Sequence, residues 1–527
     1  MDVTWTTDAI LARAVDFGQD RLAVVLGEDG SSLTYGQLSE QANRLANLLH
    51  GCGVAKGDRV AVFMENRLEY IVAYHGVARA GAVFVPIVTN SKLPEVEYFI
   101  EHAEPVALIV DDKRLDLIAD ALGNRHPAFV SVATVFNCDG ARSGLAEGYV
   151  EALRMAPSTP IADRPTPTDP VALMYTSGST GRPKAVIHSH YTAVAQAEGV
   201  CSRMGYTPDD RLMTMFPLYH GNGLVWSALT AVWACARVII HRRFSSTTFW
   251  DSARRHGATE VNLLLGSINM VLAQPERPDD ADNPIRLVLA NVTEPLYERF
   301  TRRFDVDIVS TWALSEGPLG TMTAPGHGYR DGLIGWPMGM DNVVSVVDDD
   351  DIEVPDGVIG ELVQKNRAVM NGYLKNDAET ERVFRNGWMH SGDLGYRGSD
   401  GMFYFSGRKK HVIRRGGENV SGEEVETCIE QHPAVAEAAV IAVPDDIRGE
   451  EIKAFVVLRE GVAASAEDIV ALCEAQLAGF KVPRYVEFLD KLPRTGPEKL
   501  NRPALREMAD QTSCWDRMAQ QPRKASA

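Results

Sequence analysis

Hydroxyl groups, glycines and one lysine are concentrated between residues 175 and 184, which read Tyr-Thr-Ser-Gly-Ser-Thr-Gly-Arg-Pro-Lys. Glycines let the backbone approach an anion closely, Ser and Thr hydroxyls donate hydrogen bonds, and the lysine adds positive charge. Apolar runs on both sides predict strands that end in this loop. The segment therefore predicts a phosphate-binding loop made of Thr176, Ser177, Gly178, Ser179, Thr180, Gly181 and Lys184. Its spacing is not the GxxxxGK[ST] pattern of P-loop nucleotidases, and an ordinary surface loop is the alternative.

The same ten residues resemble the signature of the adenylate-forming superfamily, which includes acyl-CoA synthetases, luciferase-like enzymes and the adenylation domains of peptide synthetases. The resemblance extends from about Thr34 to Arg506. It implies that the loop holds the β and γ phosphates of ATP. Ala185 stands where the family usually has Gly, which is a small change at a tight turn.

Two further segments resemble the parts of the family that surround the reacting groups. Residues 216–223 resemble the border of the acyl-carboxylate pocket, where the resemblance makes His220 a gate beside the carboxylate and not a base; a structural histidine is the alternative. Residues 312–316 stand in place of the family's Tyr-Gly-x-Thr-Glu. The resemblance implies that Trp312 packs on adenine, Ser315 meets phosphate, and Glu316 holds Mg²⁺ together with Thr176. A carboxylate suits this hard cation.

The resemblance also assigns residues to the ribose and to a hinge. Asp393, in residues 390–396, matches the acid that accepts hydrogen bonds from the ribose hydroxyls. Arg408 matches the residue that reaches nucleotide oxygens, and Lys410 stands at the position on which the small domain rotates. His411 is a departure, because the family commonly has Asp there.

The C-terminal part carries two more motifs of the resemblance. Gly416 and Gly417 match a loop that leaves room for the pantetheine arm of coenzyme A, although a glycine pair is also a plain turn. Lys499 matches the catalytic lysine whose positive charge stabilises the forming acyl-phosphate bond. Glu498 stands where the family has Gly, so a carboxylate lies beside that lysine, and a surface lysine without a role is the alternative.

Together these motifs imply an AMP-forming acyl-CoA synthetase that uses ATP, Mg²⁺ and coenzyme A as co-substrate. The substrate carboxylate, already ionised at neutral pH, attacks the α-phosphorus and pyrophosphate leaves. The small domain then turns about Lys410, and the coenzyme A thiol displaces AMP.

The acyl substrate is open at this stage. Three segments resemble those of crotonobetaine/carnitine-CoA ligase-like enzymes, namely residues 289–296, 415–421 and 478–483. A trimethylammonium acid would need an aromatic or anionic cage, to which Trp226, Trp233 and Trp312 could contribute. The apolar run 263–270 favours a hydrophobic acid instead, medium-chain or polycyclic.

Two alternatives belong to other classes. An adenylating enzyme specialised for the first half-reaction, which passes the acyl-adenylate to another acceptor or partner enzyme, is motivated by His411 and Glu498. A non-catalytic ligand-binding relic is the second, and the joint presence of Lys184, Glu316, Asp393 and Lys499 argues against it.

The pattern of helices and strands predicts an α/β fold. Helical spacing and short apolar runs alternate through the first part, which predicts layered, mostly parallel sheets, with a small β-rich unit between about residues 335 and 404. A smaller, mobile α+β domain follows. We expect a large N-terminal domain over 1–407, a hinge at 408–410, a small domain over 411–514 and a frayed tail over 515–527.

The composition of the chain limits which macromolecules we expect it to bind. The formal net charge of −18 repels nucleic acid and anionic lipid, so neither is an expected partner. The basic run 408–410 stands out against this charge, although a solvated turn is its plain interpretation. The seven cysteines never form CxxC, no apolar stretch spans a membrane, and the first residues lack a signal-peptide layout. We expect a cytoplasmic enzyme; a homodimer stays open.

Overall fold

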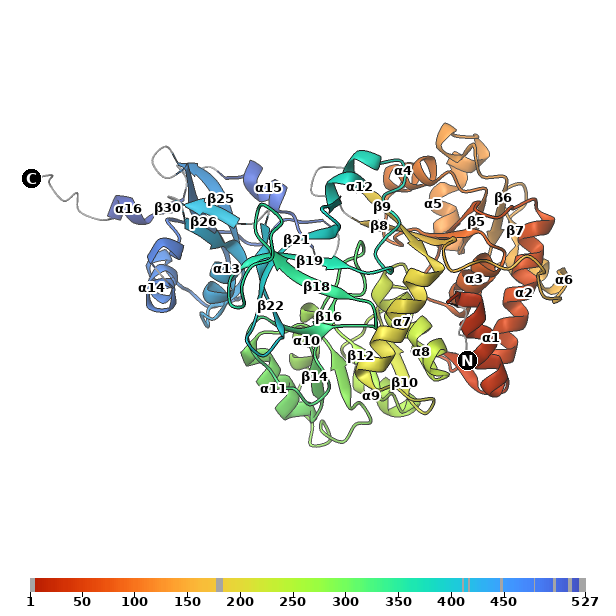
Figure 1. Cartoon of the computed structure of the whole chain (residues 1–527), viewed down its shortest axis with the longest axis horizontal. Coiled ribbons are helices and arrows are strands. Elements are labelled where there is room, and N and C mark those ends of the chain that lie inside the picture. The colour runs from red at the N-terminus through yellow and green to blue at the C-terminus, as the bar shows by residue number, and fades with distance from the viewer. Residues whose placement is uncertain are drawn as a thin grey trace, which may run out of the picture. The chain divides into compact units, whose positions relative to one another are not determined.

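The computed structural model describes residues 5–176, 183–409, 412–415, 418–445, 449–477, 479–495, 499–509 and 514–520 of the chain (Figure 1). The chain divides into two compact units. The first consists of residues 1–345 and 363–391, and the second of residues 346–362 and 392–527. The predicted hinge at 408–410 and the other predicted domain limits stay predictions.

The first sheet of the first unit carries the predicted phosphate loop. Its strand order is β7-β6-β5-β3-β4-β8-β9. All neighbouring strands are parallel except β8 and β9, which form an antiparallel pair at one edge. The strands are β3 (Arg59–Phe63), β4 (Val83–Pro86), β5 (Ala107–Val110), β6 (Thr134–Asn137), β7 (Glu147–Gly148), β8 (Pro170–Thr176) and β9 (Lys184–Ser189). The helices between them are α3 (Leu68–Arg79), α4 (Leu93–Ala103), α5 (Asp112–Gly123), η1 (Pro127–Phe129) and α6 (Tyr149–Met155).

The second sheet has the order β14-β13-β12-β10-β11-β1-β2. Its strands are β1 (Leu22–Leu26), β2 (Ser32–Thr34), β10 (Arg211–Thr214), β11 (Arg237–Ile240), β12 (Glu260–Asn262), β13 (Leu287–Leu289) and β14 (Asp307–Val309). The associated helices are α1 (Thr7–Gly18), α2 (Tyr35–Gly51), α7 (His190–Met204), the π-helix η2 (Asn222–Leu229), α8 (Thr230–Ala234), α9 (Phe249–His256), α10 (Leu265–Leu272) and α11 (Glu294–Phe304).

The mostly parallel α/β architecture is confirmed, and the order of the strands along the chain does not follow their division between the two sheets. Strand β8 lies far from β4 in the chain, yet it pairs with β4 and joins the first sheet. Conversely, β1 near the N-terminus pairs with β11 in the second sheet. The sequence of a short apolar strand does not show which sheet the strand joins, because all strands that are buried on both faces have similar apolar sequences.

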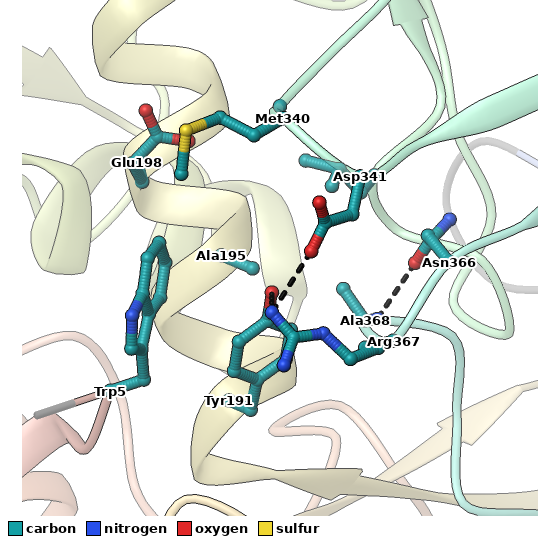
Figure 2. Close-up of a pocket in the computed structure, with 11 residues that line it drawn as sticks. Trp5, Tyr191, Ala195, Glu198, Met340, Asp341, Asn366, Arg367 and Ala368 are labelled. Atoms are coloured by element: carbon teal, nitrogen blue, oxygen red, sulfur yellow. Dashed lines mark hydrogen bonds and ion pairs between the residues drawn. The ribbon is translucent and has the colours of Figure 1, made fainter.

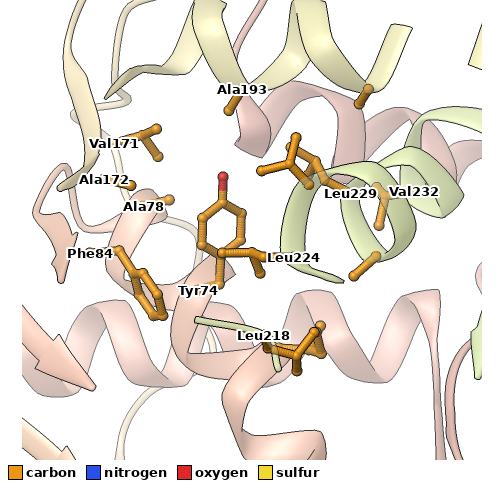
Figure 3. Close-up of a cluster of buried hydrophobic side chains, with 14 of the residues drawn as sticks. Tyr74, Ala78, Phe84, Val171, Ala172, Ala193, Leu218, Leu224, Leu229 and Val232 are labelled. Carbon is orange, nitrogen blue, oxygen red and sulfur yellow. The ribbon is translucent and has the colours of Figure 1, made fainter. Parts of the chain in front are cut away.

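Burial arranges the first unit in layers. One cluster of buried side chains joins residues of the first sheet (Val60, Val62, Phe84) to residues of the second (Leu212, Val238, Ile240) through helices α2, α3, α7 and α8. Alternate residues of the same strands, such as Ala61 and Met213, belong to two outer clusters that α4 and α5 or α9 and α11 cover. Figure 3 shows the middle of the central cluster, where the Tyr74 ring lies among Phe84, Leu224 and Leu229.

Helix α2 begins at a capping motif, and its buried residues recur at helical spacing. The Thr34 side chain accepts a hydrogen bond from the Gln37 amide, and the Gln37 side chain accepts one from the Thr34 amide, which is a capping box. The residues at helical spacing, Leu38, Ala42, Leu45, Ala46 and Leu49, are all buried. They pack against α3, where Gly76 allows Leu45 to approach closely.

Short strands dominate the chain from residue 311 to residue 408, a stretch that includes the β-rich unit predicted between about residues 335 and 404. In order they are β15 (Thr311–Trp312), β16 (Thr321–Met322), β17 (Leu333–Pro337), β18 (Val343–Val347), β19 (Gly360–Lys365), β20 (Phe384–Arg385), β21 (Trp388–Arg397) and β22 (Phe403–Arg408). Helix α12 (Asp377–Val383) lies between β19 and β20 in the chain. In the first unit β15, β16 and β17 form an antiparallel ladder, and in the second β21 pairs antiparallel with β22.

The C-terminal part of the second unit is the predicted α+β assembly. Its sheet has the order β24-β23-β26-β27-β30, with β25 paired to β26. The elements are β23 (Val412–Arg415), β24 (Glu418–Ser421), α13 (Gly422–Glu430), β25 (Val435–Asp445), β26 (Gly449–Leu458), α14 (Ala466–Gln476), η4 (Gly479–Lys481), β27 (Tyr485–Phe488), β28 (Arg494–Thr495), β29 (Lys499–Leu500), α15 (Arg502–Glu507), β30 (Trp515–Asp516) and α16 (Arg517–Gln520). Throughout the described ranges, every helix is too short or too polar to cross a lipid bilayer.

The contact between α2 and α3 gives a stability prediction. A Cβ at Gly76 would lie 2.6 Å from Leu45 Cδ2 and 2.7 Å from Leu45 Cβ, which is too close for either atom. We expect Gly76→Ala to destabilise the first unit by about 1–3 kcal/mol, because overpacking displaces the helix. Urea unfolding followed by tryptophan fluorescence measures this change.

Gly51 provides the matched control. It is the last residue of α2, and a Cβ there meets nothing within 4 Å. Gly51→Ala should leave the unfolding midpoint nearly unchanged. Equal midpoints for both variants would show that the Gly76 contact does not limit packing.

Candidate functional site

The β8–β9 hairpin brings together the two ends of the predicted phosphate loop. Thr176 is the last residue of β8 and pairs with Lys184, the first residue of β9. Ser177, Gly178, Ser179, Thr180 and Gly181 connect these ends and lie outside the described residues. The flanking strands therefore agree with the prediction, while the roles assigned to the loop residues stay predictions.

A segment far along the chain covers the open edge of β9. Asn371 donates its backbone N–H to the Ile187 carbonyl at 2.9 Å, and Ile187 donates back to Gly372 at 3.0 Å. Leu374 donates in the same way to Ala185 at 2.9 Å. The segment 371–374 thus continues the hydrogen-bonding pattern of the first sheet, and this pairing places Tyr373 beside Val186.

Lys184 is engaged by two residues of this later part of the chain. Its ammonium forms an ion pair with the Glu379 carboxylate of α12, and both side chains are mostly buried. Its Nζ atom also lies 5.3 Å from the centroid of the Tyr373 ring. Arg382 binds Glu379 with two hydrogen bonds, of 2.7 and 2.8 Å. These bonds from Arg382, together with Lys184, lower the pKa of Glu379 to about 2, so it is ionised at neutral pH.

Glu316 is held by the same segment. The Tyr373 hydroxyl donates to Glu316 Oε1 at 2.7 Å, and the Met370 amide donates to the Glu316 carbonyl at 2.8 Å. Next to it, the Ser315 carbonyl contacts Nε2 of the buried His188 at 2.7 Å. Burial lowers the pKa of His188, so the ring is neutral and its Nε2–H donates this hydrogen bond. The turn that carries Ser315 and Glu316 is therefore fixed against β9.

His220 begins a polar stretch that leads into the second sheet. Its side chain retains exposed surface, but the surrounding atoms remove enough water that burial lowers its pKa. The imidazole is therefore neutral at pH 7. Two residues on, Asn222 opens the π-helix η2, and its Oδ1 accepts a hydrogen bond of 2.7 Å from Asn262 of β12. Asn262 also donates to Ser227 Oγ at 3.1 Å.

The tryptophans proposed for a cation cage have different surroundings. Trp312 is buried in β15, and Trp226 is buried in the central cluster. Trp233 stacks with Trp5 at 5.7 Å between ring centroids, and the Arg13 guanidinium lies 4.3 Å above its ring. Trp233 thus already has a cationic partner within the protein.

Within the second unit, two predicted nucleotide-binding residues face each other. Asp393 of β21 pairs in register with Arg408 of β22, and Arg408 Nε lies 3.1 Å from Asp393 Oδ1. The Asp393 side chain is 3% exposed. Lys409, the next residue of the basic run, is neutralised by Glu361 at 3.1 Å and Asp349 at 2.8 Å.

Four further predicted residues belong to the C-terminal part of the chain, namely Lys410, Gly416, Gly417 and Lys499. Gly416, Gly417 and Lys410 lie outside the described residues. The backbone of Lys499 is described, in β29, where it pairs with Thr495 of β28. Its side chain is not, so the predicted catalytic contact of Lys499 stays a prediction.

A small recess in the first unit is separate from these residues. Figure 2 shows Arg367 lying on the Tyr191 ring, with its guanidinium 2.9 Å from Asp341 Oδ2. The cavity measures about 10 Å³, the space of roughly one water molecule. It is too small for an acyl group. No cluster of three or more His, Cys, Asp or Glu side chains suited to a metal ion occurs among the described residues.

Family models match most of the chain. Residues 11–374 match the AMP-binding enzyme family, and residues 424–499 match the AMP-binding enzyme C-terminal domain. The chain is an AMP-binding enzyme. The resemblance to the adenylate-forming superfamily is confirmed.

Relatives of this AMP-binding enzyme are acid–thiol ligases. It is 33% identical over 470 residues to the crotonobetaine/carnitine–CoA ligase of Proteus mirabilis, covering 88% of this chain and 90% of the relative. It is similar to ATP-bound MatB from Rhodopseudomonas palustris (TM-score 0.86, 29% identity, 95% of this chain and 99% of that one). It is also similar to the anthranilate CoA ligase AuaEII in complex with anthranoyl-AMP (TM-score 0.86, 25% identity, 97% and 98%).

The AMP-binding enzyme is thus an AMP-forming acid–thiol ligase: ATP activates a carboxylic acid as acyl-AMP, and the acyl group passes to coenzyme A. Three residues around the predicted phosphate site were missed, namely His188, Tyr373 and Glu379. Their sequence surroundings carry no motif that the resemblance used. Only their contacts with Ser315, Glu316 and Lys184 identify them.

A buried acid beneath the polar stretch gives a pH prediction. Glu260 lies two residues before Asn262 on β12 and is 1% exposed. Burial raises the pKa of Glu260 to about 8, well above its ordinary value of 4.5. The folded protein therefore holds a proton that the unfolded chain releases between these values. Its contribution to stability is complete below pH 4.5 and is lost as pH rises through about 8.

We expect Glu260→Gln, which cannot ionise, to remove this part of the pH dependence. The wild-type protein should lose stability relative to the variant by on the order of 4 kcal/mol between pH 5 and pH 8. Urea midpoints at both pH values measure it, with Glu298→Gln, an exposed residue of α11, as control. Parallel pH profiles for wild type and Glu260→Gln would contradict the assignment.

Proposed function

We propose that this enzyme activates a hydrophobic carboxylic acid with Mg²⁺ and ATP and transfers the acyl group to coenzyme A. One observation carries the proposal: Tyr373 contacts both Lys184 and Glu316, which come from segments more than 100 residues apart. The contacts join the predicted phosphate lysine to the predicted metal carboxylate. A structural role alone does not require an ammonium and a carboxylate to share one tyrosine.

Lys184 and Glu316 act on the phosphates in this proposal. The Lys184 ammonium has three N–H donors. One of them donates to Glu379 Oε1, so the other two can donate to phosphate oxygens. The donor types fit magnesium, because Glu316 would hold the ion with a hard carboxylate oxygen and Thr176 with a hydroxyl. Bound Mg²⁺ supplies charge neutralisation at the phosphate oxygens.

The substrate carboxylate needs no activating base in the first step, since it is ionised at neutral pH. It attacks the α-phosphorus, the bond to the bridging oxygen breaks, and pyrophosphate leaves with the electron pair. His220 is neutral, so it borders the carboxylate without binding it as a fixed counter-ion. The positive charge of Lys499 is assigned to the oxygens on which negative charge develops.

The second unit binds the nucleoside in this scheme. Asp393 is acceptor-only when ionised, which suits the two ribose hydroxyls, and Arg408 alongside supplies donors for nucleotide oxygens. The Arg408–Asp393 ion pair supports this role, because it sets the two groups at a fixed spacing before nucleotide binds. Trp312 is assigned to adenine and Ser315 to phosphate.

Coenzyme A enters in the second step. Gly416 and Gly417 are assigned to the pantetheine arm, and a turn about Lys410 exchanges Lys499 for this loop. The thiolate attacks the acyl carbon, the acyl–phosphate bond breaks, and AMP leaves with the electron pair.

A hydrophobic acid is supported by α10 and the residue before it. Leu264, Leu265 and Met270 keep 41%, 42% and 52% of their surface exposed, which is unusual for large apolar side chains so close together. Exposed apolar groups beside the polar residues Asn222 and Asn262 suit an acid with an apolar body. An acid with a quaternary ammonium is supported less, since Trp233 is already occupied by Arg13.

An enzyme specialised for the first half-reaction is the second candidate. Glu498, beside Lys499, and His411, beside Lys410, are the observations that favour it. A panel of carboxylic acids assayed for pyrophosphate release, with and without coenzyme A, separates the two candidates. Acyl-CoA formed in step with pyrophosphate supports the ligase, whereas pyrophosphate without any acyl-CoA supports the second candidate.

Replacing the assigned lysine separates the two half-reactions. We expect Lys499→Ala to slow acyl-AMP formation by about 100-fold or more, because a charge that stabilises the transition state is lost. Thioester formation from supplied acyl-adenylate should stay within about threefold of wild type, because Lys499 has left the centre by then.

Lys491→Ala is the matched control, since Lys491 is an exposed lysine of the same C-terminal stretch. It should change neither half-reaction. Undiminished adenylation in Lys499→Ala would remove the role assigned to that lysine.

A further inference from the structure

We propose that Tyr373 is a positioning residue: its ring and its hydroxyl set Lys184 and Glu316 at a fixed spacing, so that lysine and carboxylate meet the magnesium–triphosphate as one group. The inference rests on the proposed function of Lys184 and Glu316. It concerns a residue that neither the family signature nor any motif of the sequence singled out.

The backbone of Tyr373 is fixed on both sides. Its neighbours Gly372 and Leu374 are hydrogen-bonded to β9, at Ile187 and Ala185. Its own amide donates to Thr380 Oγ1 at 2.9 Å, which ties it to the first turn of α12. With 5% of its surface exposed, the side chain has little room to change rotamer. Tyr373 is therefore as rigid as the sheet it lies against.

The two ends of the side chain perform different tasks. The ring lies under the Lys184 ammonium, and a cation near an aromatic face is attracted by about 0.5–2 kcal/mol. The hydroxyl donates to only one oxygen of Glu316, Oε1. Burial, followed by the nearby Glu316 charge, raises the pKa of Tyr373 far above its ordinary value, so the phenol keeps its proton and remains a donor.

Glu379 explains why Lys184 does not collapse onto Glu316. The Lys184 ammonium is paired with Glu379, and Arg382 also binds that carboxylate. A direct ion pair between Lys184 and Glu316 would occupy both groups before a nucleotide arrives, whereas Glu379 shares its single negative charge between Lys184 and Arg382. The tyrosine thus stands between opposite charges that need to act on the same ligand, the lysine on phosphate oxygens and the carboxylate on the metal.

A specific loss follows from removing the hydroxyl alone. Tyr373→Phe keeps the ring beneath Lys184 but leaves Glu316 Oε1 without its donor, so the carboxylate can rotate. ATP binding that depends on magnesium should weaken by about ten- to 100-fold, the change in affinity that corresponds to one hydrogen bond to a charged group. ATP binding in EDTA, which uses Lys184 but not the metal, should remain within about twofold of wild type.

Isothermal titration calorimetry of the full-length protein with ATP, in Mg²⁺ and in EDTA, measures both quantities without turnover. Tyr74→Phe is the matched control, because the Tyr74 hydroxyl is buried and makes no hydrogen bond with the described residues (Figure 3). The control should leave both affinities unchanged. In a Glu316→Gln background, Tyr373→Phe should cause no further loss, since the two residues act through the same hydrogen bond.

The outcomes separate this inference from the proposed function. If Glu316→Gln weakens magnesium-dependent binding and Tyr373→Phe does not, the positioning role is wrong and the metal role of Glu316 stands. If Tyr373→Phe weakens binding equally in Mg²⁺ and EDTA, the hydroxyl supports the fold in general and the inference is overturned. If neither variant changes the magnesium dependence, the proposed metal site itself fails.

Discussion

The pairing of residues 371–374 with the edge of β9 is the interaction on which the candidate site depends. Backbone hydrogen bonds at Ala185 and Ile187 fix a late segment of the chain against the strand that begins at Lys184. Because these bonds are made by the backbone, they hold the segment in register whatever its side chains are. Tyr373 can therefore reach Lys184 and Glu316 at the same time, and the site needs no separate scaffold.

Two sheets with a shared core supply the rigidity behind this edge. Side chains of both sheets and of the helices between them form one buried cluster, so neither sheet can shift alone. The strand β8, which delivers Thr176, is an interior strand of the first sheet, whereas β9 lies at its rim. The predicted phosphate loop thus joins an interior strand to the strand at the rim of the sheet.

Local patterns in the sequence predicted the parts whose causes are local. The strands on either side of the phosphate loop, the β-rich stretch and the α+β character of the C-terminal domain follow from spacing and apolar runs. Strand order did not, because β1 and β8 are each buried by partners distant in the chain. The roles of Tyr373 and Glu379 could not be predicted for the same reason. Glu379 lies 195 residues from Lys184 in the chain, and Tyr373 lies 57 residues from Glu316. A contact of that kind leaves no periodic trace in a single sequence.

The covered rim of the first sheet also bears on solubility. An open edge strand presents unpaired backbone groups that can template intermolecular β-pairing. In this enzyme the residues that complete the candidate site occupy such groups on β9, namely the Ala185 carbonyl and the carbonyl and amide of Ile187. Loss of the pairing between residues 371–374 and β9 would expose an aggregation-prone edge strand and would also disturb the site. Protection against aggregation and the preparation of the nucleotide site therefore depend on the same few hydrogen bonds.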